Sequence, residues 1–158
     1  MRLRLIALGT RMPPWVDAGV EEYARRLRGT WKLELTELPV ARRGSDASPD
    51  AIARAKAGEA RRVLALLSER DFLVALDERG AQPSTLELSQ WLAARRADEL
   101  TFVIGGPDGL ASEVLARAQY RWSLSRLTLP HGLVRVLVAE QLYRACMLLA
   151  GHPYHRGG

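Results

Sequence analysis

A glycine-rich segment in the second half of the chain carries the clearest chemical signal. Residues 104–110 read Ile-Gly-Gly-Pro-Asp-Gly-Leu, at the end of the most apolar predicted strand. Three glycines around a proline and an aspartate allow a backbone to approach a flat ligand closely, with amides free to donate. A tight turn between a strand and a helix is the alternative for the same pattern. The spacing matches neither the GxGxxG dinucleotide fingerprint nor a P-loop.

The histidines and the cysteine give little support to metal binding or covalent catalysis. His131, His152 and His155 are the only histidines, and no cysteine or clustered carboxylate stands beside the C-terminal pair. Cys146 lies in an apolar helical segment, which favours a buried, inert thiol. No Gly-x-Ser-x-Gly segment is present. We therefore expect no metal site, and an enzyme on this chain would work by holding its reactants together.

The basic residues are almost all arginine. Of 23 basic residues only Lys32 and Lys56 are lysines, and the formal net charge is +5. A GC-rich coding bias would give this usage, and so would a need for planar guanidinium groups that recognise phosphates and bases. The positive excess lies in residues 1–49 and 109–158. A polyanionic partner would therefore meet the surfaces formed by the two ends of the chain.

Length and composition indicate a single globular domain. The chain has 158 residues, of which 47% are hydrophobic and 26% charged. These values are ordinary for a folded protein and far from those of a disordered one. No apolar run reaches the roughly 18 residues that a membrane span needs. The N-terminus lacks the pattern of a secretory signal. We expect a cytoplasmic protein that spans no membrane.

Strand patterns alternate with helix patterns along the chain, which predicts an α/β fold with a mostly parallel sheet covered by helices on both faces. A capping box from Ser84 to Glu87 is predicted at the start of one helix. The predicted strands are 2–9, 32–39, 72–76 (within the segment 71–80, which turns polar at Asp77), 100–106 and a short strand within 122–130, and the predicted helices are 15–27, 51–68, 84–96, 111–118 and 132–149.

The last predicted helix is apolar around most of its circumference. Burial in a subunit interface, with Leu142 on it, would explain this composition, and so would a central position in the monomer. Glu140 and Arg144 form an i, i+4 pair on it. The tail after it, residues 152–158, contains two histidines, a tyrosine and an arginine. Such a tail is suited to stacking on a base and touching phosphate.

Three segments together resemble one family over essentially the whole chain. They are LGTRMPPWVDAGVEEYARRL, FVIGGPDGL and WSLSRLTLPHGLVRVLVAEQLYRACMLLAGHPYHR. The chain resembles the ribosomal RNA large subunit methyltransferase H family of the SPOUT class. The resemblance implies S-adenosylmethionine as cofactor, a C-terminal trefoil knot and a homodimer. It implies methylation of N3 of a pseudouridine in 23S rRNA of the assembled 70S ribosome, and one SPOUT domain over 1–158.

The resemblance also implies site residues. A valine at Gly105 is then expected to fill space that the cofactor needs, and the Arg126 side chain is expected to point outward to RNA. The implied cofactor contacts are Leu76, Gly105, Leu124, Ser125, Arg126, Leu127, Thr128 and Leu129. The candidates for orienting or deprotonating the base are Glu140, Arg144, His152, Tyr154, His155 and Arg156, with the tail of one subunit covering the cofactor of the other.

Arg42 and Arg43, in a polar loop, are candidates for contact with the rRNA backbone. Two alternatives stay open. A non-catalytic ribosome-binding or assembly factor could use the same pocket to sense a ligand, although the glycine segment and the tail favour an enzyme. A SPOUT enzyme that acts on tRNA is disfavoured because no appended RNA-binding domain is present.

Overall fold

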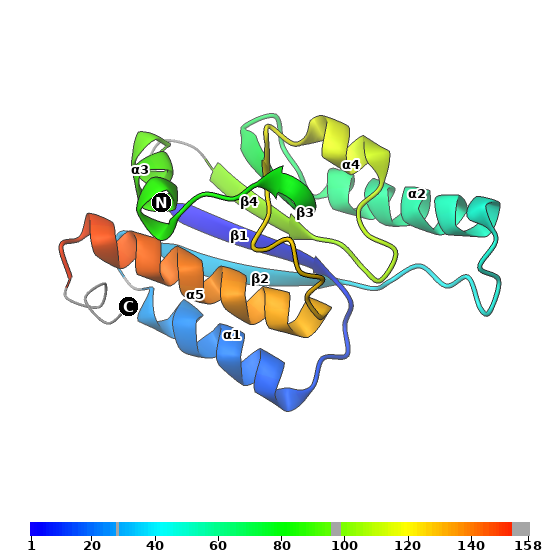
Figure 1. Cartoon of the computed structure of the whole chain (residues 1–158), viewed down its shortest axis with the longest axis horizontal. Coiled ribbons are helices and arrows are strands. Elements are labelled where there is room, and N and C mark those ends of the chain that lie inside the picture. Colours follow the sequence, from blue (N-terminus) through cyan, green and yellow to red (C-terminus); the bar gives the residue numbers. More distant parts are fainter. Residues whose placement is uncertain (28, 96–98, 153–158) are drawn as a thin grey trace.

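The computed structural model describes residues 1–27, 29–95 and 99–152. Within these ranges, five parallel strands form one sheet in the order β2-β1-β4-β3-β5 (Figure 1). The predicted α/β class and parallel sheet are confirmed. The strands are β1 (Arg2–Leu8), β2 (Lys32–Leu38), β3 (Asp71–Ala81), β4 (Glu99–Ile104) and β5 (Tyr120–Trp122), and the helices are α1 (Pro14–Arg26), α2 (Pro49–Ala65), α3 (Thr85–Ala94), α4 (Ser112–Arg117) and α5 (His131–Leu149).

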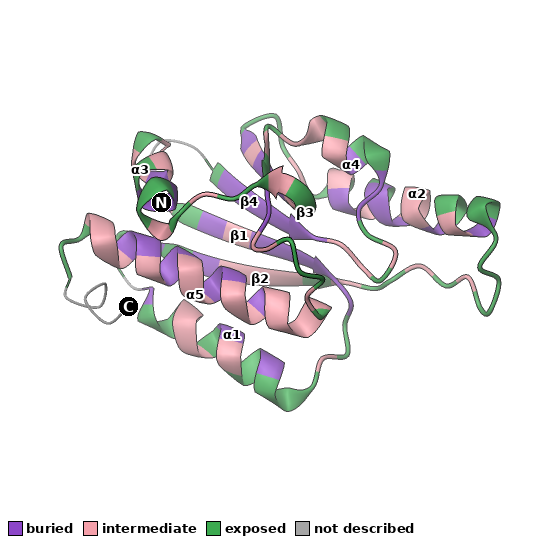
Figure 2. Ribbon diagram, viewed as in Figure 1, coloured by how far each residue is buried: buried purple, intermediate pink, exposed green. Residues whose placement is uncertain are grey.

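Helices cover both faces of the sheet. α5 packs between α1 and α3 on one face, and α2 contacts α4 on the other (Figure 1). Successive residues of β1 supply the two cores, since Leu5 joins the cluster under α1, α3 and α5, and Ile6 joins the cluster under α2 and α4. The central strands are therefore buried along most of their length (Figure 2).

Serine side chains begin two of the helices. Ser48 accepts a hydrogen bond from the Ala51 amide at the start of α2. At the start of α3, Ser84 accepts from the Glu87 amide, and the Glu87 carboxylate accepts from the Ser84 amide. These bonds satisfy amides that have no partner within the helix. The predicted capping box is confirmed.

The edge formed by β3 and β5 differs from the prediction. β3 continues to Ala81, with its pairing to β5 interrupted after Leu76. β5 begins two residues earlier than predicted, at Tyr120, and the rest of the predicted segment is an irregular loop. Gly80 explains the close approach, because a Cβ there would lie 2.6 Å from the carbonyl carbon of Arg121. Only glycine lets the two backbones meet at this point.

The helix α5 belongs to the core of its own chain. Leu142, predicted to lie on a subunit interface, is fully buried against the sheet and the neighbouring helices. That prediction was wrong because an all-apolar helix does not reveal from its sequence which side faces the core. Cys146 is also fully buried, and burial raises the pKa of its thiol to about 12. In the described ranges, no helix has both the length and the apolarity to cross a membrane.

The trefoil knot implied by the resemblance concerns how the C-terminal loops thread one another. Strand order and register do not establish threading. The knot therefore stays a prediction that rests on the family.

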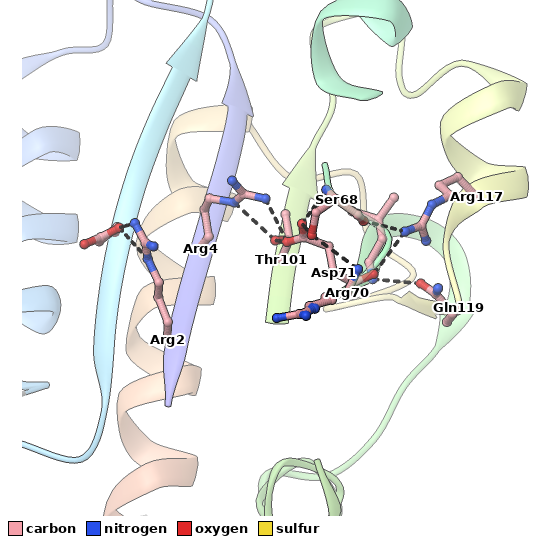
Figure 3. Close-up of polar contacts among 10 residues, drawn as sticks. Arg2, Arg4, Ser68, Arg70, Asp71, Thr101, Arg117 and Gln119 are labelled. Atoms are coloured by element: carbon pink, nitrogen blue, oxygen red, sulfur yellow. Dashed lines mark hydrogen bonds and ion pairs between the residues drawn. The ribbon is translucent and has the colours of Figure 1, made fainter. Parts of the chain in front are cut away.

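A buried carboxylate ties the amino ends of three strands together (Figure 3). Asp71 accepts hydrogen bonds from Thr101 Oγ1 at 2.6 Å, from the Ser68 amide at 2.7 Å and from Arg4 Nη2 at 2.7 Å. Arg117 donates to the Asp71 carbonyl at 3.1 Å. Burial acts to raise the pKa of Asp71, but the bonds from Thr101 and Ser68 and the charge of Arg4 outweigh it and lower that pKa.

We expect Asp71→Asn to lower the free energy of unfolding by about 3 kcal/mol near neutral pH, because an amide places donors against donors and leaves Arg4 without its charge partner. Since the folded pKa is lowered, the carboxylate stabilises the fold above its unfolded pKa. That stabilisation is lost as pH falls through the folded pKa. Urea unfolding at pH 7 and below pH 4 should therefore show that the difference in free energy of unfolding between wild type and Asp71→Asn becomes smaller in acid. Glu69→Gln, at an exposed neighbour, is the control; an equal effect there would contradict this account.

Candidate active site

A cavity of about 640 Å³ opens at the carboxyl ends of β3 and β4. This is the edge where open parallel sheets bind ligands, and the volume lies in the usual range for small-molecule pockets. Its lining includes apolar side chains, among them Ile104, Leu115 and Val134. The others are Lys56, Leu76, Asp77, Glu78, Arg79, Gly105, Gly106, Pro107, Asp108, Gly109, Arg121, Trp122, Ser123, Leu124, Ser125, Leu127, Thr128, Leu129 and His131.

The cavity brings together most of the predicted cofactor residues, from three separate parts of the chain. Arg126 is the exception: it is exposed and is not among the lining residues. Its outward position agrees with the expectation that its side chain faces solvent or RNA. The predicted residues that line the cavity are Leu76, Gly105, Leu124, Ser125, Leu127, Thr128 and Leu129.

The glycine segment forms a closed turn on one wall. The Gly109 amide donates to the Gly106 carbonyl at 3.0 Å, and Gly109 has a φ of +79°, which favours glycine. A Cβ on Gly105 would lie 2.8 Å from the Gly109 carbonyl carbon. A side chain at this position would therefore collide with the other end of the turn. The expectation that it would fill ligand space directly was wrong in its mechanism.

The loop 123–130 forms the opposite wall and is held by its serines. The Ser123 hydroxyl donates to the Ser125 carbonyl at 2.9 Å, and the Ser125 hydroxyl accepts from the Leu127 amide at 3.0 Å. The Ser123 amide donates to the Ala81 carbonyl at 2.8 Å, which fixes the loop to the end of β3. Leu127 remains 72% exposed at the cavity mouth. These bonds hold the loop backbone in place without bound ligand.

Behind the glycine turn lies a polar cluster that the sequence did not predict. Arg135 is fully buried, and it donates to His131 Nε2 at 2.8 Å, to Glu37 Oε2 at 2.5 Å and to the Gly9 carbonyl at 2.6 Å. His131 Nδ1 lies 2.7 Å from the Gly105 carbonyl oxygen. Burial, followed by the charge of Arg135, lowers the pKa of His131. The i, i+4 spacing of His131 and Arg135 was the one available sequence signal.

Charged side chains of both signs surround the mouth of the cavity, including Lys56, Arg79 and Glu78. Asp108, in the glycine turn, accepts two hydrogen bonds from Arg43, at 3.0 and 3.1 Å. Arg43 was predicted to contact rRNA, but its guanidinium is engaged with the turn. Its neighbour Arg42 is exposed.

Three of the predicted base-orienting residues, Glu140, Arg144 and His152, are described in the structure, and none of them lines the cavity of its own chain. Glu140 and Arg144 bond to each other at 2.8 Å on α5, and neither lines the cavity. Glu140 stands nine residues beyond His131, about 14 Å along the helix axis. His152 is exposed beyond the far end of α5. Tyr154, His155 and Arg156 lie outside the described residues.

Comparison with known proteins identifies the family. Residues 1–155 match the family described as predicted SPOUT methyltransferase. The chain is 54% identical over 160 aligned residues to the ribosomal RNA large subunit methyltransferase H of Alkalilimnicola ehrlichii, with 99% of each chain covered. The chain belongs to this family of SPOUT methyltransferases. It is also 51% identical to the protein of the same name from Pseudomonas fluorescens, over 99% of this chain and 100% of the relative.

Two solved structures agree with this chain in fold. A probable methylase family protein from Haemophilus influenzae superposes with a TM-score of 0.55 at 14% identity, covering 96% of this chain and 69% of the other. A protein studied for 2-OH methylation of C/U34 on tRNA gives a TM-score of 0.50 at 22% identity, with 96% and 98% covered. These similarities support the fold alone.

SPOUT methyltransferases take their methyl group from S-adenosylmethionine, and the cavity suits this ligand. Gly105, Gly106 and Gly109 add no side chains to the cavity, and the apolar lining residues Ile104, Leu115 and Val134 suit an adenine ring. The loop 123–130 supplies five further lining residues, Leu124, Ser125, Leu127, Thr128 and Leu129. The residues present therefore fit the cofactor.

Proposed function

We propose that this chain methylates N3 of a pseudouridine in 23S rRNA on the assembled 70S ribosome, with S-adenosylmethionine as donor. The observation that carries the proposal is the glycine-walled cavity in a chain 54% identical to a ribosomal RNA large subunit methyltransferase H. The whole chain, 1–158, acts in this proposal as one SPOUT domain, with 152–158 as its functional tail.

S-adenosylmethionine, when bound, supplies a methyl group on a positively charged sulfur that is reactive toward a nucleophilic nitrogen. The protein then has two tasks: to hold the base beside the cavity and to let the N3 proton leave. In this proposal the cavity residues hold the donor. Holding two reactants in place supplies most of the rate for such a transfer.

The reach of the tail supports a site shared between two chains. The α5 residues that line the cavity, His131 and Val134, lie in its first turn, and the helix is 19 residues long, about 28 Å (Figure 1). The His152 amide donates to the Met147 carbonyl at 2.9 Å, which anchors the chain at the far end of α5. Four residues from there to Arg156 span at most about 14 Å. Because this span is about half the length of α5, a partner's cavity is the target of the tail in this proposal.

One face of α5 suits a homodimer interface. Its residues are only partly buried, and along the helix they are interspersed with the fully buried residues that face the core. Leu133, Leu137 and Leu148 make this face largely apolar, and Glu140 and Arg144 lie between them. In a dimer built on this face, Glu140 and Arg144 would meet the partner subunit. There they could orient the target base together with Tyr154, His155 and Arg156.

We expect the protein to be a dimer at micromolar concentration and Leu137→Arg to convert it to a folded monomer, because a long charged side chain in the middle of the proposed face would lose its water and displace the apolar contacts on dimerisation. Sedimentation velocity gives the oligomeric state, and circular dichroism checks the fold. Leu86→Arg, at a leucine 58% exposed on α3, should remain dimeric. A monomeric wild type, or a dimeric Leu137→Arg variant, would contradict this interface.

The function itself is tested by methyl transfer from labelled S-adenosylmethionine to 70S ribosomes, free 23S rRNA and tRNA in parallel. Mass mapping then locates the product. We expect incorporation into ribosomes at N3 of one pseudouridine, and little into the other two substrates. Methylated tRNA would favour the tRNA enzyme. Absence of transfer with tight ribosome binding would favour a non-catalytic factor.

A further inference from the structure

The complete burial of Arg135 is not explained by a contribution to the stability of the fold. A guanidinium with no exposed surface is costly to desolvate, and a buried ion pair is weak support for stability. The Nε, Nη1 and Nη2 atoms of Arg135 donate hydrogen bonds to three different parts of the chain. Two of them, Glu37 and Gly9, lie at the carboxyl ends of β2 and β1. The third, His131, reaches the residue that follows β4.

Donor and acceptor chemistry fixes the state of His131. A guanidinium only donates, so His131 Nε2, 2.8 Å from Arg135 Nε, must accept. The ring proton of neutral His131 then sits on Nδ1 and is donated to the Gly105 carbonyl at 2.7 Å. Arg135 therefore selects the tautomer that holds Gly105, in the manner of the outer partners that orient metal-bound histidines.

The conformation of Gly9 belongs to the same arrangement. Its φ of +133° lies in the range that favours glycine, and a Cβ there would lie 3.2 Å from Arg135 Nη2. The backbone thus turns so that the Gly9 carbonyl accepts from Arg135 at 2.6 Å. The bonds to Glu37 and Gly9 fix the guanidinium at the carboxyl ends of β2 and β1. The bond from His131 to the Gly105 carbonyl connects it to the glycine turn.

We propose that Arg135 and His131 are a positioning pair that fixes the Gly105 carbonyl, and so presets the glycine turn for S-adenosylmethionine before the cofactor binds. The inference rests on the proposed use of the cavity as the cofactor site. His131 lines the cavity, whereas Arg135 acts through it. Neither group needs to take part in the transfer of the methyl group or the N3 proton.

Two substitutions of His131 separate the two bonds. His131→Asn can place its side-chain N–H where Nδ1 lies and keep the bond to Gly105, while Arg135 loses its acceptor. His131→Gln can keep an acceptor for Arg135 but places no donor at Gly105. We expect His131→Asn to melt at a lower temperature than His131→Gln, yet to bind S-adenosylmethionine more tightly. His131→Gln should bind about tenfold more weakly, the cost of one lost hydrogen bond.

Calorimetry with S-adenosylmethionine gives the affinities, and amide exchange of Gly109 in the cofactor-free protein gives an independent measure of turn order. We expect faster Gly109 exchange in His131→Gln and wild-type exchange in His131→Asn. The contrary result is that His131→Asn, the variant with the lower melting temperature, also shows the weaker cofactor binding and the faster Gly109 exchange. The pair would then have only a structural role, and the proposal would be overturned. A wild type that binds no S-adenosylmethionine would instead refute the cofactor site, while the exchange result would still report on the pair.

Discussion

Removal of residues 153–158 should lower methyl transfer to ribosomes by about 10²–10⁴-fold, the range for losing groups that move or position a proton. The bonds that end α5, from the Gly151 amide to Leu148 and from the His152 amide to Met147, are kept in this truncation. We therefore expect a normal melting temperature, a dimer and unchanged affinity for S-adenosylmethionine. Single-turnover methylation with labelled cofactor measures the loss.

A shorter truncation is the matched control. Removing only Gly157 and Gly158 keeps Tyr154, His155 and Arg156 and should leave the rate close to wild type. If the protein without 153–158 methylates ribosomes as fast as the full chain, the tail has no part in the reaction.

Gly105→Ala should weaken S-adenosylmethionine binding by about 10–100-fold, because its Cβ would lie 2.8 Å from the Gly109 backbone and must force the turn open. Gly106→Ala is a control in the same turn. A Cβ at Gly106 meets Val40 at 3.5 Å, an ordinary contact, and points at no part of the turn. Calorimetry should therefore separate the two variants clearly. Equal affinities would mean that the turn does not shape the cofactor site.

The sequence predicted the parallel sheet because strand patterns alternate with helix patterns along the chain, and the capping box at Ser84 marked one helix start. It predicted most of the cavity because the family's motifs lie at the carboxyl ends of strands. It missed the extension of β3, since the close approach at Gly80 depends on a backbone more than 40 residues later in the chain.

Two side chains show why local patterns failed elsewhere. Arg135 looked like one charge on an apolar helix, but its partners come from β1, β2 and the first turn of α5, which only the tertiary fold brings together. Arg43 looked like a free cation in a polar loop, but the fold places it against Asp108. Each of these arginines has a hydrogen-bond partner that lies 65 or more residues away in the sequence.

A mixed dimer of two impaired variants, assayed at a cofactor concentration that saturates the wild-type cavity but not the Gly105→Ala cavity, tests the shared site most directly. One variant lacks residues 153–158 and keeps its cavity; the other carries Gly105→Ala and keeps its tail. Each mixed dimer then holds one complete site if the tail acts on the partner's cavity. With equal amounts and random exchange, the mixture should recover about a quarter of wild-type methyl transfer to ribosomes, because half of the dimers are mixed and each has one of two sites intact. Verified mixed dimers with no more activity than either variant alone would contradict the shared site.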